Sequence, residues 1–365
     1  MTALAEKLLR RVRARGPITF AEYMEAALYD SEYGYYATRA RIGFEGDFLT
    51  ASDLGPAFGQ LLARAAADLW RTLGQPAEWD LVEAGAGMGT TMRDLLGALP
   101  REAAAAASGA RPAIVEVSQP LREQQARALP GGALRWAASP RELAPINGVV
   151  FANELLDALP FHVLVRTPAG VAEAFVGEEQ GRLAEVFGAP SLARLYSRIP
   201  EALPVGGRWE VSLAAELWIE ELAKSLTRGY LLVLAYADDE AGLLARRGAG
   251  TVRGCARHRL LEDPLAAPGE HDITATVDLT AVARAAERAG LREVGRGTQR
   301  DVLIALGALD PTRSAPAPLE RLRAASRRAA TSALLDPNGF GAFTVVCFAK
   351  NAPAGTTRMF AGGPA

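Results

Sequence analysis

The chain has 365 residues, which is enough for one large α/β domain with an added element or for two domains. Its 40 lysine and arginine residues nearly balance 42 aspartate and glutamate residues, for a net charge of −2. Nucleic-acid-binding proteins usually carry a basic excess, so no nucleic acid is expected as partner. Two cysteines and three histidines without metal-ligand spacing argue against a metal site and fit a reducing compartment.

Residues 1–15 form the first predicted element, a basic helix. Its apolar residues recur at helical spacing among arginines: Leu4, Leu8, Leu9 and Val12. A transit peptide or a membrane-surface helix has the same pattern. We prefer a packed first helix, because the sequence after Gly16-Pro17 has the pattern of ordered structure. No run approaches the roughly 20 apolar residues of a transmembrane helix, so we expect a cytoplasmic protein without a membrane partner.

The segment at residues 81–90, LVEAGAGMGT, is the most informative one. It predicts a buried strand at 79–84, with an acid near its end, that leads through a glycine turn into a helix at 91–96. Side chains at alternate positions of the turn would block close approach of a nucleoside-containing ligand. The acid and the three glycines are Glu83, Gly85, Gly87 and Gly89.

The spacing of these glycines distinguishes between cofactors. The dinucleotide fingerprint G-x-G-x-x-G would have its last glycine where Thr90 stands. The form E-x-G-x-G-x-G is instead typical of S-adenosylmethionine (SAM) sites, so SAM is the expected cofactor. A glycine-rich turn without a ligand is the alternative.

Short apolar runs alternate with helical stretches from residue 79 onward, which favours a mostly parallel α/β sheet covered by helices. The runs lie at 79–84, 113–117, 134–137, 148–152, 230–236, 291–295 and 343–349. They suit the class I (Rossmann-like) methyltransferase sheet, in which the last strand is inserted antiparallel. Residues 1–78 are predicted as a helical N-terminal region before a core at 79–365. Residues 161–225 are predicted as an insert, an antiparallel β-meander at 161–188 followed by a helix.

Polar residues follow two further predicted strands. Glu116, followed by Val117, stands where a carboxylate can accept hydrogen bonds from both ribose hydroxyls of the cofactor. Asn153 and Glu154 end the fourth strand, and strand ends on this side face the ligand crevice. A carboxylate there can hold a guanidinium or accept a proton from a nucleophile. Asp157 is either a site residue or a helix cap.

These residues are part of a longer pattern that resembles the MidA family of SAM-dependent methyltransferases. This is the family of the mitochondrial complex I assembly factor that methylates an arginine. The matching segments span nearly the whole chain: GPITFAEYM at 16–24, YGYY at 33–36, GDFLTASD at 46–53, NELLDALP at 153–160 and DITA at 272–275.

The resemblance implies an N-terminal lid that folds over the cofactor and contains Gly46, Asp47, Phe48, Thr50 and Ser52. It implies that Thr90 and Val117 also bind the cofactor, together with the glycine turn and Asn153. It places His258 near the substrate mouth, so the candidate catalytic residues are Asn153, Glu154, Asp157 and His258.

The predicted function is methyl transfer from SAM to a nitrogen or oxygen nucleophile, with a protein arginine as the acceptor typical of the family. Ala235 stands where many relatives have an acid, which favours a small molecule, methylated on oxygen or nitrogen, as the alternative acceptor. A SAM-binding assembly factor without turnover is a further alternative, although a pure binder has little need of Asn153 and Glu154. Both a monomer and a homodimer are compatible with the sequence.

Overall fold

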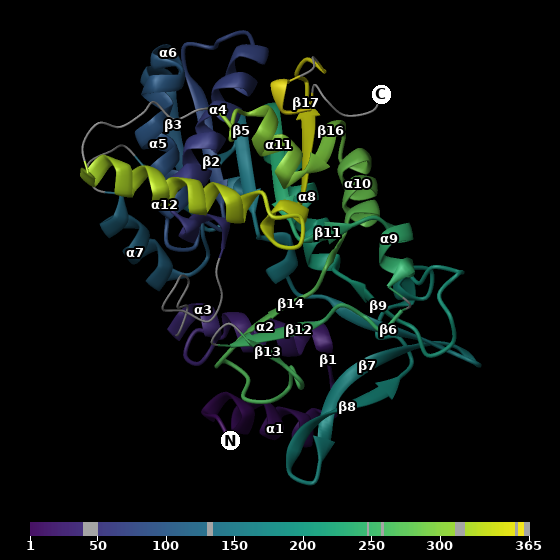
Figure 1. Cartoon of the computed structure of the whole chain (residues 1–365). Coiled ribbons are helices and arrows are strands. Elements are labelled where there is room, and N and C mark those ends of the chain that lie inside the picture. The colour runs from purple at the N-terminus through teal and green to yellow at the C-terminus, as the bar shows by residue number, and fades with distance from the viewer. Residues whose placement is uncertain are drawn as a thin grey trace. The chain divides into compact units, whose positions relative to one another are not determined.

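The structure is a computed structural model that describes residues 1–38, 50–129, 134–246, 248–256, 259–310, 318–354 and 357–360 (Figure 1). The chain divides into two compact units that are interleaved in sequence. Unit 1 contains Met1–Phe48, Leu156–Ile219 and Ala237–Ala285, and unit 2 contains Leu49–Leu155, Glu220–Tyr236 and Ala286–Ala365.

Unit 2 is built around a seven-stranded sheet with the order β16-β17-β10-β5-β2-β3-β4. Its strands are β2 (Trp79–Ala84), β3 (Ala110–Val115), β4 (Arg135–Ala137), β5 (Ile146–Asn153), β10 (Leu226–Ala235), β16 (Arg292–Thr298) and β17 (Thr344–Lys350). β17 pairs antiparallel with β10 and β16, whereas the other pairs are parallel. The predicted class I methyltransferase sheet, with its last strand inserted antiparallel, is confirmed.

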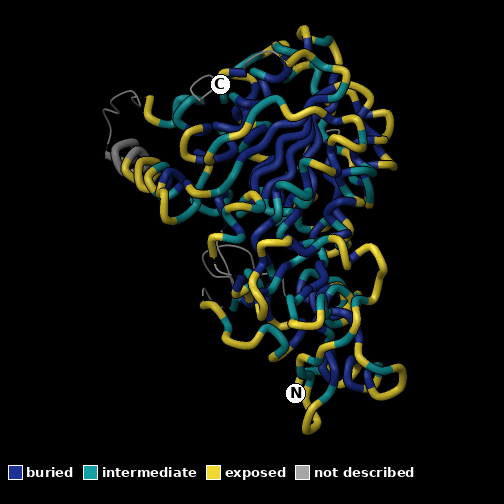
Figure 2. Tube along the Cα trace, turned by 90° about the vertical axis from the view of Figure 1, so that its right-hand side faces the viewer, coloured by how far each residue is buried: buried dark blue, intermediate teal, exposed yellow. Residues whose placement is uncertain are grey.

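The central strands lie in the buried interior of unit 2, where Figure 2 shows them as neighbouring dark blue tubes. Residues of β2, β5 and β10 such as Leu81, Phe151 and Leu232 pack into one apolar cluster with α4 (Ala57–Thr72), α5 (Thr90–Glu102) and α11 (Gln299–Ala305). Because helices cover these strands, their sequences lack the alternation of half-exposed strands. The helix predicted at 91–96 is α5, and it continues to Glu102.

Unit 1 contains the N-terminal helices α1 (Ala3–Arg15), α2 (Phe20–Tyr29) and α3 (Tyr35–Thr38). The apolar stripe of α1 is buried, which confirms a packed first helix. The predicted meander is also confirmed, because β6 (His162–Thr167), β7 (Gly170–Glu179) and β8 (Arg182–Gly188) pair antiparallel in sequence order. β1 (Ile18–Thr19) and β9 (Arg208–Val211) complete this five-stranded sheet.

The remaining elements are mostly short. The helices are α6 (Ala104–Gly109), α7 (Gln119–Ala128), α8 (Leu213–Ser225), α9 (Glu240–Ala245), α10 (Leu279–Arg288) and α12 (Pro318–Leu334). The strands are β11 (Ala237–Asp238), β12 (Arg253–Ala256), β13 (Arg259–Leu261), β14 (Asp272–Thr274) and β15 (Val277–Asp278).

The two units divide the chain differently from the predicted boundaries. Helices α1 to α3 belong to unit 1, whereas α4 belongs to unit 2 because it packs on α5. The units thus group elements that are distant in sequence, and the predicted domain boundaries at residues 78, 161 and 225 stay predictions.

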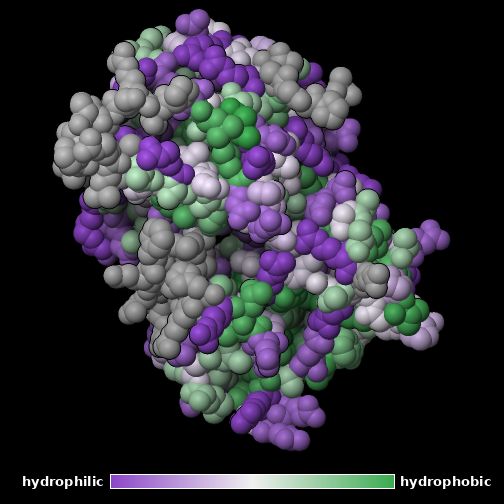
Figure 3. Space-filling model, in the orientation of Figure 1, coloured by the Kyte–Doolittle hydropathy of each residue, from purple (hydrophilic) through white to green (hydrophobic). Residues whose placement is uncertain are grey.

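The face of the molecule in Figure 3 mixes hydrophilic and apolar residues, with apolar patches separated by hydrophilic ones. Such scattered apolar exposure is ordinary for a folded protein. Within the described ranges, no helix combines the length and the apolar character needed to cross a membrane.

Candidate active site

The predicted glycine turn after β2 has an unusual backbone conformation. Gly85, Gly87 and Gly89 have φ values of +69°, +50° and +78°, in a region that other residues rarely adopt. A Cβ atom on Gly85 would lie 2.9 Å from Cδ1 of Leu155. Helix α5 begins at Thr90, directly after the turn, so its first backbone N–H groups follow the three glycines. The strand, the glycine turn and the helix thus follow one another as predicted, and the binding of a ligand to this turn stays a prediction.

Glu83 lies on β2 just before this turn and is only 4% exposed. Burial raises the pKa of its carboxyl group to about 8, although the Thr91 hydroxyl and the Met92 N–H donate to it and lower that value. Its Oε2 atom is buried and has no hydrogen-bond partner in the described part of the chain. A buried carboxyl oxygen without a hydrogen-bond partner is unfavourable unless a ligand supplies one.

Glu116 and Val117 follow β3, which ends at Val115 and not at residue 117 as predicted. The Glu116 carboxylate accepts hydrogen bonds from the Ser118 N–H at 2.9 Å and from Nε2 of Gln125 at 3.3 Å. Burial raises its pKa. Val117 is 64% exposed and offers an apolar surface directly beside this carboxylate.

Asn153 and Glu154 lie at the end of β5. Glu154 has a φ of +51°, which is uncommon for a residue other than glycine and typical of functional sites. Its N–H donates to the Leu234 carbonyl oxygen at 2.8 Å, and its Oε1 accepts a hydrogen bond from Nδ2 of Asn153 at 3.2 Å. Oδ1 of Asn153 is buried and has no partner among the residues that the structure describes.

The predicted lid residues Thr50 and Ser52 lie near Glu154. Thr50 caps the 3-10 turn Ala51–Leu54, with its hydroxyl 2.8 Å from Oδ2 of Asp53 and 2.7 Å from the Ser52 hydroxyl. The turn presents the Ala51 N–H to Oε1 of Glu154 at 3.3 Å. The other lid residues, Gly46, Asp47 and Phe48, lie outside the described residues, as does His258.

Asp157 belongs to unit 1, on the 3-10 turn Leu156–Ala158. Burial and the charge of Asp272 on β14 raise its pKa to about 7. Its Oδ1 atom is buried without a partner in the described ranges. The Tyr36 hydroxyl donates to Asp272 at 3.0 Å, and Asp272 is the acidic residue whose charge acts on Asp157 inside unit 1.

The sequence analysis missed Gln125, a completely buried residue of α7. Its Nε2 donates to the Gly87 carbonyl oxygen at 2.9 Å as well as to Glu116. Its Oε1 accepts a hydrogen bond from Nε1 of Trp136 at 3.0 Å. The one sequence signal was its position four residues after Leu121 on the buried face of the helix, since no motif contains it.

The residues of unit 2 fit SAM. Buried oxygen atoms of Glu83 and Asn153 lack hydrogen-bond partners in the described ranges, and SAM carries polar groups that can supply them, an ammonium group and two ribose hydroxyls. The carboxylate of Glu116 can accept from such hydroxyls, and the glycine turn allows close backbone approach. In the described ranges, no group of histidine, cysteine and acidic residues is placed to hold a metal ion.

The sheet order, the glycine turn, Glu83 on β2 and Glu116 directly after β3 define a class I SAM-dependent methyltransferase. The chain belongs to the family described as putative S-adenosyl-L-methionine-dependent methyltransferases, whose model matches residues 61–296. The predicted methyltransferase activity and cofactor are thereby confirmed.

Two groups of relatives support this assignment. The chain is 30% identical to the mitochondrial protein arginine methyltransferase NDUFAF7 of Homo sapiens, over 79% of this chain and 69% of that protein. It is also 30% identical to the NDUFAF7 homolog of Drosophila melanogaster, over 79% and 71% of the two chains. A crystal structure from Burkholderia thailandensis with bound S-adenosyl-homocysteine superimposes with a TM-score of 0.89 and 29% identity, covering 99% of this chain and 95% of that one.

Proposed function

We propose that this methyltransferase acts on a nitrogen nucleophile, and that the acceptor is an arginine side chain of a protein. The observation that carries the proposal is the carboxylate of Glu154 at the end of β5, held by Asn153 and by the Ala51 N–H. A carboxylate matches the planar, charged guanidinium group of arginine. The relatives named as protein arginine methyltransferases support the same acceptor.

Bound SAM supplies an electrophilic methyl group on a sulfonium. The residues that would hold it are Glu83, the glycine turn, Thr90, Glu116 and Val117. Glu154 orients the acceptor nitrogen, whose lone pair forms the bond to the methyl carbon as the carbon–sulfur bond breaks. The carboxylate of Glu154 then takes the proton that the nitrogen loses. The protein acts mainly by positioning these groups. Catalytic roles for Asp157 and His258 stay predictions.

A small-molecule acceptor is the second candidate. Ala235 ends β10 and is 1% exposed, so this strand end contributes no carboxylate to bind a guanidinium. Many relatives are expected to have an acid at this position, and its replacement by Ala235 favours an acceptor that needs fewer acidic contacts than a guanidinium group does.

Transfer of labelled methyl groups tests the proposal. The purified protein is incubated with methyl-labelled SAM and an extract of its source, and labelled proteins are separated from labelled small molecules. We expect a labelled protein band, in which mass spectrometry locates the label on an arginine. Label confined to the small-molecule fraction would contradict this proposal and favour the second candidate. The same assay is run with the Glu154→Gln variant. Label that is present with the wild type and lost with the variant depends on Glu154.

A further inference from the structure

We propose that Gln125 is a positioning residue that joins the glycine turn to Glu116 and thereby sets the affinity for SAM. The two groups follow different strands, β2 and β3. Both must be held in place to bind the two ends of one cofactor. Gln125, from α7, contacts both of them and is completely buried.

The two hydrogens on Nε2 of Gln125 match its two acceptors. The carbonyl oxygen of Gly87 lies at 2.9 Å, and Oε2 of Glu116 lies at 3.3 Å. The side chain also packs against the third glycine, since a Cβ atom on Gly89 would lie 3.2 Å from Cγ of Gln125. The Gln125 side chain therefore donates hydrogen bonds to Gly87 and to the Glu116 carboxylate, and it occupies the space that a side chain on Gly89 would need.

Trp136 on β4 determines which way the Gln125 amide faces. The indole N–H is only a donor, so the atom 3.0 Å from it is the amide oxygen. If the amide were flipped, its N–H group would face the indole N–H of Trp136, donor against donor. Its oxygen would face the oxygen atoms of Gly87 and Glu116, acceptor against acceptor. The amide nitrogen therefore faces Gly87 and Glu116.

This orientation has consequences on both sides. The Gly87 carbonyl is held toward Gln125, and the Met88 N–H of the same trans peptide points the opposite way. At Glu116, Oε1 accepts from Ser118 and Oε2 accepts from Gln125. The Ser118 N–H and the Gln125 amide therefore engage different oxygens of the carboxylate, and each oxygen has a second lone pair with which it can accept a hydrogen bond from a ribose hydroxyl.

The binding of S-adenosyl-homocysteine (SAH) to the full chain tests the proposal by calorimetry. This measurement does not depend on the acceptor proposed above. Gln125→Leu should weaken SAH binding at least about tenfold, because it removes both donors. Gln119→Leu, an exposed glutamine on the same helix, is the matched control and should bind SAH as the wild type does.

Gln125→Glu gives a readout that a purely structural role would not change. At pH 8 the new carboxylate would face the Gly87 carbonyl and Glu116, so SAH binding should be weaker than in Gln125→Leu. Relative to the wild type at the same pH, which shares Glu83 and Glu116 and their titration, it should recover toward pH 6, because a protonated carboxyl group again donates one hydrogen bond. The positive charge of Arg122 acts on Glu116, and Arg122 donates to the Glu116 carbonyl oxygen at 2.6 Å. It is unchanged in all variants, so it does not account for a difference between them. Affinity that stays constant relative to the wild type across this range would overturn the proposal.

Trp136→Phe keeps the test decisive if the Gln125 variants fold poorly. As a single substitution, with Gln125 present, it should weaken SAH binding, because the Gln125 amide loses the indole N–H that orients it. Where Gln125→Leu folds, Trp136→Phe should have no further effect in that background, since Trp136 acts through Gln125. Wild-type affinity in Trp136→Phe, or additive losses in the double variant, would overturn the proposal.

Discussion

The side-chain Oε1 of Glu154 accepts a hydrogen bond from the backbone N–H of Ala51 at 3.3 Å, although the residues are 103 positions apart in sequence. Asn153 donates a second hydrogen bond to the same oxygen at 3.2 Å. Donors from two elements of unit 2 therefore orient this carboxylate. A fixed carboxylate suits a group that must accept a proton at a defined position.

Glu154→Gln should separate cofactor binding from turnover. The amide keeps the size of the side chain but cannot accept the proton of the acceptor nitrogen, so kcat should fall about 100-fold or more. SAH affinity should stay within about twofold, because Glu83, Glu116 and the glycine turn are unchanged. Calorimetry with SAH measures the affinity, and the initial rate of methyl transfer from labelled SAM to saturating acceptor measures kcat. Glu123→Gln, on the exposed side of α7, is the control, and full activity in Glu154→Gln would remove Glu154 from the mechanism.

Gly87→Val should abolish SAH binding in a protein that still folds. Gly87 has a φ of +50°, where a β-branched residue is a genuine outlier, so the turn must change its conformation. We expect affinity to fall at least about 100-fold while circular dichroism retains the native spectrum. Gly97→Ala is the control, because an added Cβ in that exposed part of α5 meets no heavy atom within 4 Å. It should raise the free energy of unfolding by about 0.5 kcal/mol. Wild-type SAH affinity in Gly87→Val would contradict the role of the turn.

The sequence was sufficient for the sheet because its central strands are buried and therefore continuously apolar. The sequence predicted this strand at 113–117, whereas β3 begins at Ala110. Its half-exposed start contains Arg111 and Pro112, which do not have the pattern of a buried strand. Strand β1, with two residues, was missed because its strand character depends on pairing with β7. The glycine turn and Glu83 were predictable from adjacent residues. Gln125 was not, because its role depends on a contact with Gly87, 38 positions away.

Glu83 should make the unliganded protein less stable as the pH rises. Its pKa in the folded protein is about 8, against an ordinary value of 4.5. Between these values the folded state holds a proton that the unfolded chain has lost, so the free energy of unfolding falls with increasing pH. Glu83→Gln lacks this contribution. The wild-type free energy of unfolding minus that of the variant should therefore decrease by a few kcal/mol from pH 5 to pH 8.5.

Urea unfolding of the wild type and Glu83→Gln at four or more pH values measures this difference. Glu78→Gln, at an exposed position just before β2, is the control and should follow the wild type at every pH. A difference between wild type and Glu83→Gln that does not depend on pH would show that Glu83 is ionised in the folded protein.

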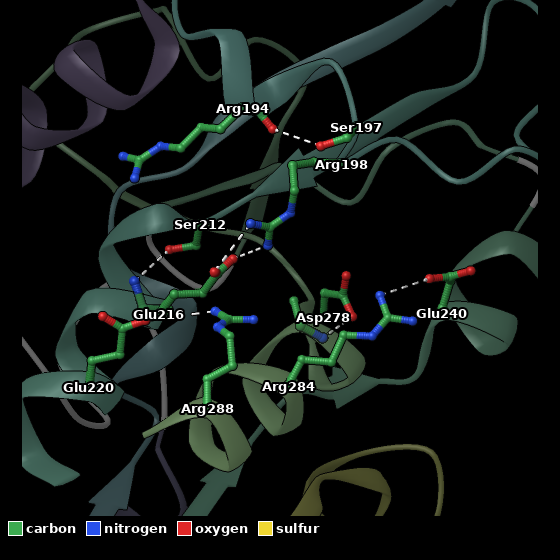
Figure 4. Close-up of polar contacts among 12 residues, drawn as sticks. Arg194, Ser197, Arg198, Ser212, Glu216, Glu220, Glu240, Asp278, Arg284 and Arg288 are labelled. Atoms are coloured by element: carbon green, nitrogen blue, oxygen red, sulfur yellow. Dashed lines mark hydrogen bonds and ion pairs between the residues drawn. The ribbon is translucent and has the colours of Figure 1, made fainter. Parts of the chain in front are cut away.

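Arg198→Met should destabilise unit 1. Arg198 donates two hydrogen bonds to the Glu216 carboxylate, and Arg194 points away from this pair (Figure 4). The Glu216 side chain is 9% exposed, so loss of these donors leaves a poorly hydrated carboxylate. We expect the free energy of unfolding to fall by about 2 kcal/mol. Arg194→Met removes the same charge from an exposed position of the turn Ala193–Leu195 and should change stability by less than about 0.5 kcal/mol. Equal losses in the two variants would show that net charge, and not the contact with Glu216, is responsible.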